Sequence, residues 1–132
     1  MPASRVVPPL NRSIKITQIY YNAPGRDTRA NLNGEWVKIT NTGSRPVWLT
    51  GYTLRDASNR VYRFPRTRLG AGRSLKVYSG RVAETTSSRG WRLKTHIWNN
   101  SGRESARLRD SFGRAVSSRY WTSRRVGVIR FR

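Results

Sequence analysis

The segment NGEWVKITNTGSRPVWLTGYTLRD, at residues 33–56, constrains the fold more strongly than any other part of the chain. Val37 and Ile39 alternate with polar or aromatic neighbours, and a period of two is the pattern of a half-buried strand rather than of a helix. Residues 41–44 (NTGS) have the composition of a turn. The segment therefore predicts two paired strands joined by a short turn, then a third strand, with Val37, Ile39 and Leu54 pointing into the core.

Other short stretches have the same β-branched, aromatic or alternating character. They are IKITQIYY at 14–21, RVYRF at 60–64, SLKVY at 74–78, SARLRD at 105–110 and a short strand near Tyr120 and Trp121. In the first stretch Ile14 and Ile16 share one face while Ile19 and Tyr21 share the other, which predicts either a bulge or a strand that crosses between sheets. Residues 80–90 are expected to form a polar loop. No segment keeps helical periodicity for ten residues, so the sequence predicts an all-β, mostly antiparallel sandwich or barrel.

The charge of the chain is strongly unbalanced. Its 132 residues, which fit one domain, include 27 Lys and Arg against 6 Asp and Glu, a formal net charge of +21. Such a chain repels itself and attracts polyanions. Of the 27 bases 23 are arginine, whose planar fork of donors suits phosphate. An arginine-rich genome would explain the preference for arginine over lysine, but not the shortage of acids.

Several functional classes find little support in the sequence. Without cysteine the chain has no disulfide, thiolate zinc site or thiol nucleophile, and no metal or other cofactor is expected. No apolar run approaches the roughly 20 residues of a membrane span. The start of the chain, MPASRVVPPLNR, lacks the apolar core of a signal peptide. A cytoplasmic, nucleoid-associated location is therefore favoured over a secreted or envelope one.

Catalysis is not expected. His96 is the only histidine, and the six acids are spread singly rather than in pairs that could converge on a pocket. Asp56 and Asp110 each follow an arginine at a strand end, where ion pairing or turn capping is the expected role. The glycine-rich segment at 70–73 lacks the Lys and Ser or Thr of a phosphate loop and predicts a β-turn.

Basic side chains are the candidate binding residues. On strands whose apolar residues point inward, the basic residues between them must point outward. The predicted nucleic-acid contacts are Arg63, Arg66, Arg68, Lys76, Arg107, Arg109, Arg124, Arg125, Arg130 and Arg132. The predicted organisation is an extended arm at 1–12, a sandwich domain at 13–121 and a basic tail at 122–132. The alternative role for the tail is an added edge strand that contains Val126, Val128, Ile129 and Phe131.

The two halves of the chain differ in charge. Residues 67–132 hold 16 bases and 3 acids, net +13, whereas residues 1–66 hold 11 and 3, net +8. Within the first half, residues 33–56 are nearly balanced, with Lys38, Arg45 and Arg55 against two acids. We therefore expect residues 33–56 to build the scaffold and the later strands and tail to carry the binding charge.

Four segments in order resemble the lamin tail domain family, in particular its stand-alone bacterial, actinomycete-like members. They are IKITQIYYNAPGRD, LNGEWVKITNTGSRPVWLTGYTLRD, VYRFPRTRLGAGRSLKVYSG and IWNNSGRESARLRD, which together cover roughly residues 14–121. The resemblance implies an immunoglobulin-like sandwich that acts as a binding module and has no catalytic residues. It also implies DNA or protein partners, as in animal members, or a place beside envelope enzymes, as in bacterial ones.

Two departures from that family pattern shift the expectation towards anion binding. Arg103 follows Gly102 where many bacterial relatives carry Asp, and a basic segment follows Trp121. The favoured function is a non-enzymatic module that contacts polyanions, with nucleic acid as the first choice. An envelope or extracellular module that binds acidic polymers or proteins, and a structural subunit of a larger assembly, are the alternatives. The oligomeric state stays open.

Overall fold

The computed structural model describes residues 8–21, 35–80, 82–92, 102–123 and 127–131. Within these ranges the chain forms strands and turns, and no helix. The strands are β1 Ile14–Tyr21, β2 Trp36–Asn41, β3 Val47–Trp48, β4 Thr53–Asp56, β5 Val61–Arg63, β6 Arg68–Leu69, β7 Ser74–Tyr78, β8 Ser88–Gly90, β9 Gly102–Arg109, β10 Ala115–Ser123 and β11 Gly127–Arg130.

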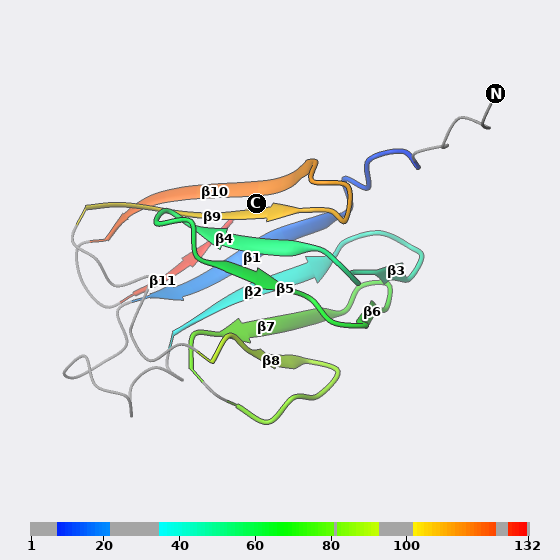
Figure 1. Ribbon diagram of the computed structural model, residues 1–132, viewed down its shortest axis with the longest axis horizontal. Coiled ribbons are helices and arrows are strands. Elements are labelled where there is room, and N and C mark those ends of the chain that lie inside the picture. The colour runs from blue at the N-terminus through cyan, green and yellow to red at the C-terminus, as the bar shows by residue number, and fades with distance from the viewer. Residues whose placement is uncertain (1–7, 22–34, 81, 93–101, 124–126, 132) are drawn as a thin grey trace.

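Two sheets lie face to face (Figure 1). One has the strand order β11-β1-β2-β7-β8, and the other has the order β10-β9-β4-β5. A two-stranded ribbon, β3-β6, lies at one end of the molecule. Every pairing is antiparallel except that of β7 with β8. The protein is therefore an all-β, immunoglobulin-like sandwich, which confirms the predicted fold.

Apolar side chains from both sheets fill the space between them. The five-stranded sheet contributes Ile14, Ile16, Ile19, Val37, Ile39, Leu75 and Val77. The four-stranded sheet and the residues beside it contribute Leu54, Tyr62, Phe64, Ala106, Leu108 and Trp121. The three core positions predicted from residues 33–56 have no exposed surface, and burial of each such side chain stabilises the fold by about 1.5–3 kcal/mol. Since strand residues alternate in direction, the residues between these positions lie on the two outer faces.

A bulge in β1 keeps three isoleucines on the same face. The register of β1 against β2 shifts at Thr17, and Ile14, Ile16 and Ile19 are all fully buried. Thr17 itself is turned outwards, with its Oγ1 2.7 Å from Oγ1 of Thr40. The bulge predicted from the change of parity is confirmed, because it restores the buried alternation after one extra residue.

The edge of β1 that faces away from β2 is closed in two ways. Its second half pairs with β11, which confirms the alternative role of the C-terminal residues as an edge strand. In its first half, the backbone N–H of Ile16 donates to Oγ of Ser117 at 3.1 Å, and Nε of Arg119 donates to the Ile16 carbonyl at 3.0 Å. Side chains of β10 therefore satisfy backbone groups that a further strand would otherwise pair.

Three expectations about the strands are wrong. β2, β3 and β4 do not pair with one another; each belongs to a different sheet, because the turns between them carry the chain from layer to layer. Residues 80–90 are not all loop, since 88–90 form β8 by parallel pairing with β7. The strand expected near Tyr120 and Trp121 is present but is not short, since residues 115–123 form one continuous strand. Its inward side includes Ser117 and Arg119, so the apolar alternation that marks a strand is missing.

Candidate anion-binding surfaces

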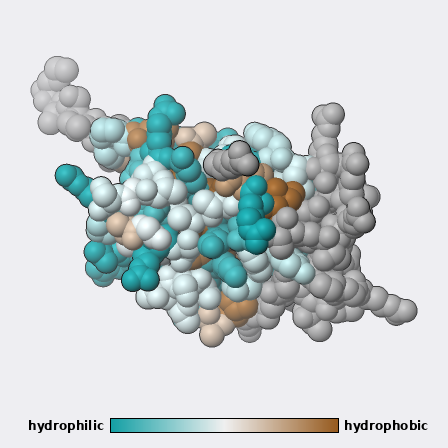
Figure 2. Space-filling model, turned by 180° about the vertical axis from the view of Figure 1, so that it is seen from behind, coloured by the Kyte–Doolittle hydropathy of each residue, from teal (hydrophilic) through white to brown (hydrophobic). Residues whose placement is uncertain are grey.

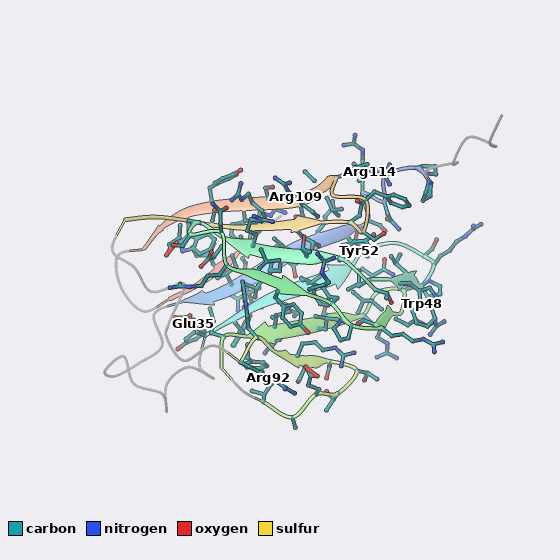
Figure 3. All side chains as sticks on the ribbon, in the orientation of Figure 1. Glu35, Trp48, Tyr52, Arg92, Arg109 and Arg114 are labelled. Carbon is teal, nitrogen blue, oxygen red and sulfur yellow. The ribbon has the colours of Figure 1, made fainter. Side chains whose placement is uncertain are left out.

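Four arginines stand on the outer face of the four-stranded sheet. Leu54 of β4 and Leu108 of β9 point into the core, so their neighbours in the chain point outward. Side chains crowd this side of the molecule, where Arg109 is labelled in Figure 3. We call the set the arginine face: Arg55, Arg63, Arg107 and Arg109.

Strand register determines how these four side chains are spaced on the face. Arg55 of β4 lies directly opposite Arg107 of β9. Arg63 of β5 and Arg109 of β9 both lie opposite Thr53, which separates them. Residues directly opposite each other have Cβ atoms about 5 Å apart, and like charges at such positions destabilise a sheet. The folded protein thus holds a repulsive pair on the two inner strands of this sheet.

Few groups compensate the charge of the arginine face. Arg107 donates from Nη2 to Oδ1 of Asn59 at 3.2 Å, and Arg63 donates from Nη1 to the carbonyl of Gly51 at 3.4 Å. The ion pairs formed between described residues involve other arginines. In the same part of the chain, Nε of Arg55 and Nε of Arg107 are buried and have no hydrogen-bond partner. The guanidinium groups of this face therefore have few hydrogen bonds within the protein and no ion pair with a described carboxylate.

Most carboxylates of the described residues lie in the interior. Glu35, Asp56, Glu104 and Asp110 are 0%, 1%, 4% and 6% exposed, and Glu84 is the one that stands in solvent. Buried carboxylates need hydrogen bonds to offset the loss of water. The acids are therefore committed to internal contacts, and the bases on the outer faces have no acid beside them among the residues described.

Asp56 and Asp110 each organise a turn. Oδ1 of Asp110 accepts the backbone N–H groups of Phe112 and Arg114, both at 2.9 Å, and Oδ2 accepts Nε of Arg114 at 2.8 Å. Asp56 repeats the pattern with the backbone and guanidinium of Arg60, at 2.7 Å and 3.4 Å. The predicted ion pairing and turn capping are both confirmed.

A second set of bases lies on the outer face of the five-stranded sheet, the side seen in Figure 2. We call it the lysine face: Lys15, Lys38, Lys76 and Arg130. Lys38 of β2 lies directly opposite Lys76 of β7, and Gln18 of β1 lies opposite both Lys38 and Arg130. A hollow of about 290 Å³ opens beside the two lysines. The face therefore has its own row of bases across four neighbouring strands.

Aromatic and hydroxyl side chains flank this row. Trp36 lies opposite both Tyr20 and Tyr78, with its ring centroid 5.8 Å from that of Tyr20. The ammonium of Lys76 lies 4.2 Å from the Trp36 centroid, within cation–π distance. On the other side of the bases the hydroxyls of three residues form a hydrogen-bonded chain: Thr17, Thr40 and Ser74.

The β3-β6 ribbon carries a third, smaller group. Trp48 is 50% exposed and lies opposite Arg68, and the guanidinium of Arg66 is 5.3 Å from the Trp48 ring centroid. Figure 3 shows Trp48 at the end of the molecule, away from Arg109. Trp48 of the ribbon therefore lies apart from Arg109 of the arginine face.

Comparison with known families identifies the fold. The model of the family described as the lamin tail domain matches residues 8–123, which is most of the chain. The chain belongs to the lamin tail domain family. The match spans β1 to β10 and ends before β11. No curated protein matches the chain.

The lamin tail domain brings some of the ten predicted contacts together and separates others. Three lie on the arginine face: Arg63, Arg107 and Arg109. Two lie on the lysine face: Lys76 and Arg130. Two lie on or beside the ribbon: Arg66 and Arg68. Three lie outside the described residues: Arg124, Arg125 and Arg132.

Sequence reasoning missed three members of the two faces, namely Arg55, Lys15 and Lys38. The sequence assigned residues 33–56 to the scaffold, but Arg55 and Lys38 of that segment stand on the outer faces while its two acids are buried. The alternation of apolar and polar residues in the sequence already indicates that both side chains point outward. Which strand lies beside each of them depends on the topology, and the sequence did not reveal it.

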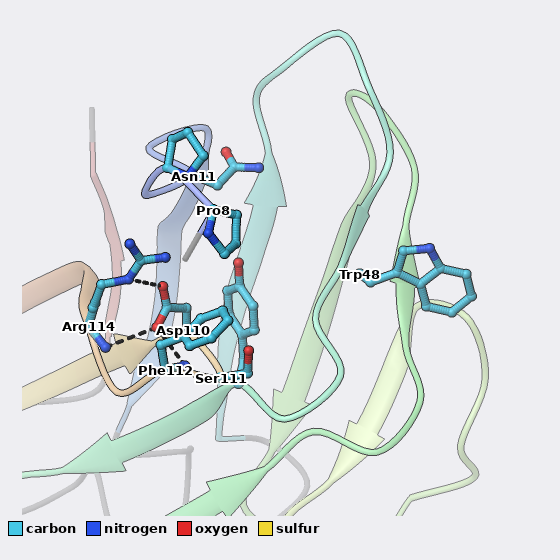
Figure 4. A pocket seen from close by; sticks show the side chains of 9 residues that line it. Pro8, Asn11, Trp48, Asp110, Ser111, Phe112 and Arg114 are labelled. Carbon is cyan, nitrogen blue, oxygen red and sulfur yellow. Dashed lines mark hydrogen bonds and ion pairs between the residues drawn. The ribbon is translucent and has the colours of Figure 1, made fainter. Parts of the chain in front are cut away.

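A pocket of about 230 Å³ opens beside the turn between β9 and β10 of this lamin tail domain (Figure 4). Pro8, Tyr52, Asp110, Phe112 and Arg114 are among its lining residues. The carboxylate of Asp110 is occupied by its turn, as the dashed lines show. Burial raises the pKa of the Tyr52 hydroxyl, and the charge of Asp110 raises it further. The Asp110 carboxylate therefore serves the local structure.

The remaining motifs have structural roles or lie outside the described residues. Residues 70–73 form the predicted β-turn, in which the N–H of Arg73 donates to the Gly70 carbonyl at 3.0 Å and Gly72 has a φ of 70°. His96 lies outside the described part of the chain. In that part no three His, Cys, Asp or Glu residues gather as a metal site would require, and no helix is long and apolar enough to cross a membrane.

Proposed function

We propose that this lamin tail domain is a non-enzymatic module that binds nucleic acid through the phosphate backbone, with the arginine face as its main contact surface. The observation that carries the proposal is the direct opposition of Arg55 and Arg107, neither of which forms an ion pair with a described carboxylate. A phosphate between two guanidinium groups replaces repulsion by charge-assisted hydrogen bonds, which are the stronger kind. Folding thus leaves a site that a phosphate completes.

The shape of this face favours contact that ignores base sequence. The bases of the arginine face project from the broad outer side of a four-stranded sheet, whereas a major groove admits a helix or a two-stranded ribbon. Contacts to phosphate position a protein on nucleic acid but do not read its sequence. Three predicted contacts near the end of the chain would add to the same charge: Arg124, Arg125 and Arg132.

A salt titration of binding to a duplex of random sequence tests the proposal. Each phosphate neutralised adds about 0.9 to the negative slope of log K against log salt, so four contacts on the arginine face predict a slope near −3.6. The double substitution Arg55→Gln and Arg107→Gln should reduce the slope by about 1.8. The matched control removes the same charge at two exposed residues away from the face, Arg12→Gln and Arg45→Gln, and should change it less.

Two results would overturn the proposal. One is a binding constant that does not change between 50 and 200 mM salt, because phosphate contacts release counterions and must weaken with salt. The other is the absence of duplex binding at low salt by a protein that still binds an acidic wall polymer or an acidic protein. That second result would instead support an envelope module.

A further inference from the structure

We infer that one molecule of this domain binds two nucleic-acid duplexes at once, one on the arginine face and one on the lysine face. The inference rests on the proposed function, because it assumes that outward bases of this fold contact phosphate. It goes further in making the molecule a bridge between two duplexes. The observations that carry it are the second basic face and its position on the opposite side of the core.

The lysine face repeats the central feature of the arginine face. Lys38 and Lys76 lie directly opposite each other on β2 and β7, just as Arg55 and Arg107 do on β4 and β9. Each pair sets like charges on neighbouring strands, where they disfavour the free protein and favour an anion between them. The outward residues described on β1, β2, β7 and β11 include no acid.

The two faces point away from each other. The arginine face is the outer side of one sheet and the lysine face is the outer side of the other, with the shared hydrophobic core between them. DNA has a persistence length of about 150 base pairs, so a duplex of about 20 base pairs is a stiff rod. One such rod cannot wrap from one face to the other, and full occupancy of both faces requires two rods.

The two faces differ in chemistry, and this predicts an order of filling. The arginine face presents planar forks that can hold phosphate in a bidentate manner, whereas a lysine acts as a point charge. The ammonium of Lys76 also interacts with the Trp36 ring, and this contact competes with phosphate. We therefore expect the first duplex on the arginine face and the second on the lysine face at a higher concentration.

A capture assay tests the bridge. A 20-base-pair duplex is fixed to beads, and a second, fluorescent duplex of the same length is retained only when the protein holds both. The mass of the complex in solution, measured with free duplexes in excess, gives the number of protein and duplex molecules. We expect one protein with two duplexes, and retention of the fluorescent duplex at least tenfold above beads without protein.

Variants of each face assign the two sites. Lys38→Gln with Lys76→Gln should keep binding to a single duplex but lose most of the capture, and so should Arg55→Gln with Arg107→Gln. Each double variant removes a repulsive pair and leaves the core unchanged, so both should fold, as thermal melting can show. The matched control, Arg12→Gln with Arg45→Gln, removes the same charge at exposed positions and should capture as the unaltered protein does.

The possible outcomes separate this inference from the proposed function. No binding of even one duplex at low salt would refute the proposed function itself. Binding of one duplex only, at saturation, would refute the bridge and leave the proposed function intact. Capture by a complex with two protein molecules, or capture reduced no more by the face variants than by the control, would also refute bridging by a single molecule.

Discussion

Replacing Arg55 by Gln should raise the free energy of unfolding of the isolated domain, although most substitutions lower it. Arg55 lies directly opposite Arg107, and no described carboxylate pairs with either side chain. Removing one of the two charges therefore removes a repulsion that exists only in the folded state. The gain in stability and the loss of phosphate affinity should come from the same substitution.

The register sets the size of the effect. Cross-strand pairs of charged side chains at directly opposite positions are worth about 0.2–1 kcal/mol. The shorter Gln side chain also loses some packing of the arginine stem against the sheet. We therefore expect a net gain of about 0.5 kcal/mol, which corresponds to a rise of about 2 °C in Tm for a domain of this size.

Urea unfolding at low and high salt measures this gain. Urea is chosen because guanidinium chloride would screen the charges under study. Arg45→Gln is the control, since it lowers the net charge of +21 by the same amount at an exposed loop position. Arg55→Gln should be more stable than Arg45→Gln in 20 mM NaCl, and this advantage should disappear in 1 M NaCl, where the Debye length is about 3 Å.

Two results would refute this reasoning. If Arg55→Gln is no more stable than Arg45→Gln at low salt, the opposed guanidinium groups do not repel measurably. If Arg55→Gln is still the more stable variant in 1 M NaCl, the cause of its advantage is packing rather than charge. Either result would also remove the physical reason for placing the main phosphate contact at Arg55 and Arg107.

Three further predictions concern stability. Asp110→Ala should lower the free energy of unfolding by about 2–3 kcal/mol, because it leaves turn N–H groups and the guanidinium of Arg114 without their acceptor. Asp110→Asn should lose less than half as much. Equal losses for the two variants in urea unfolding would argue against the capping role. Burial, assisted by the charge of Glu84, raises the pKa of Tyr62 from 10.0 to about 12. Between pH 10 and 12 the folded state therefore keeps a proton that the unfolded state releases, and the free energy of unfolding should fall. Tyr62→Phe should flatten that fall, and an identical pH profile of the variant would contradict the assignment. Ser117→Ala should cost about 1–2 kcal/mol by leaving the β1 edge unsatisfied, with faster amide exchange in the first half of β1 as the measurement; unchanged exchange would exclude this role.

Local patterns in the sequence were enough to predict the core and the turns. The alternation around Val37 and Ile39, the change of parity after Ile16 and the Arg-Asp dipeptides at strand ends each reflect interactions within a few residues. Those features therefore hold whatever the order of the strands. They predicted correctly which side chains are buried and what Asp110 does.

The two basic faces depend on contacts between distant residues, and the sequence could not predict them. Arg55 and Arg107 meet only because β4 and β9 are neighbours in the sheet. β8 is a strand through its pairing with β7 alone, as its residues Ser88–Gly90 have no strand-forming pattern. The nearly balanced charge of residues 33–56 does not extend to their surface, since burial of Glu35 and Asp56 removes their carboxylates from it.

The closure of the β1 edge has a consequence for the rate of folding. Arg119 and Ile16 are 103 residues apart in the sequence, yet they must meet before the edge of β1 is protected. Sandwiches built on such distant contacts fold in milliseconds to seconds. During that time the unpaired backbone of β1 can accept a strand from another molecule. The step that completes this sandwich is therefore also the step at which two copies can exchange strands.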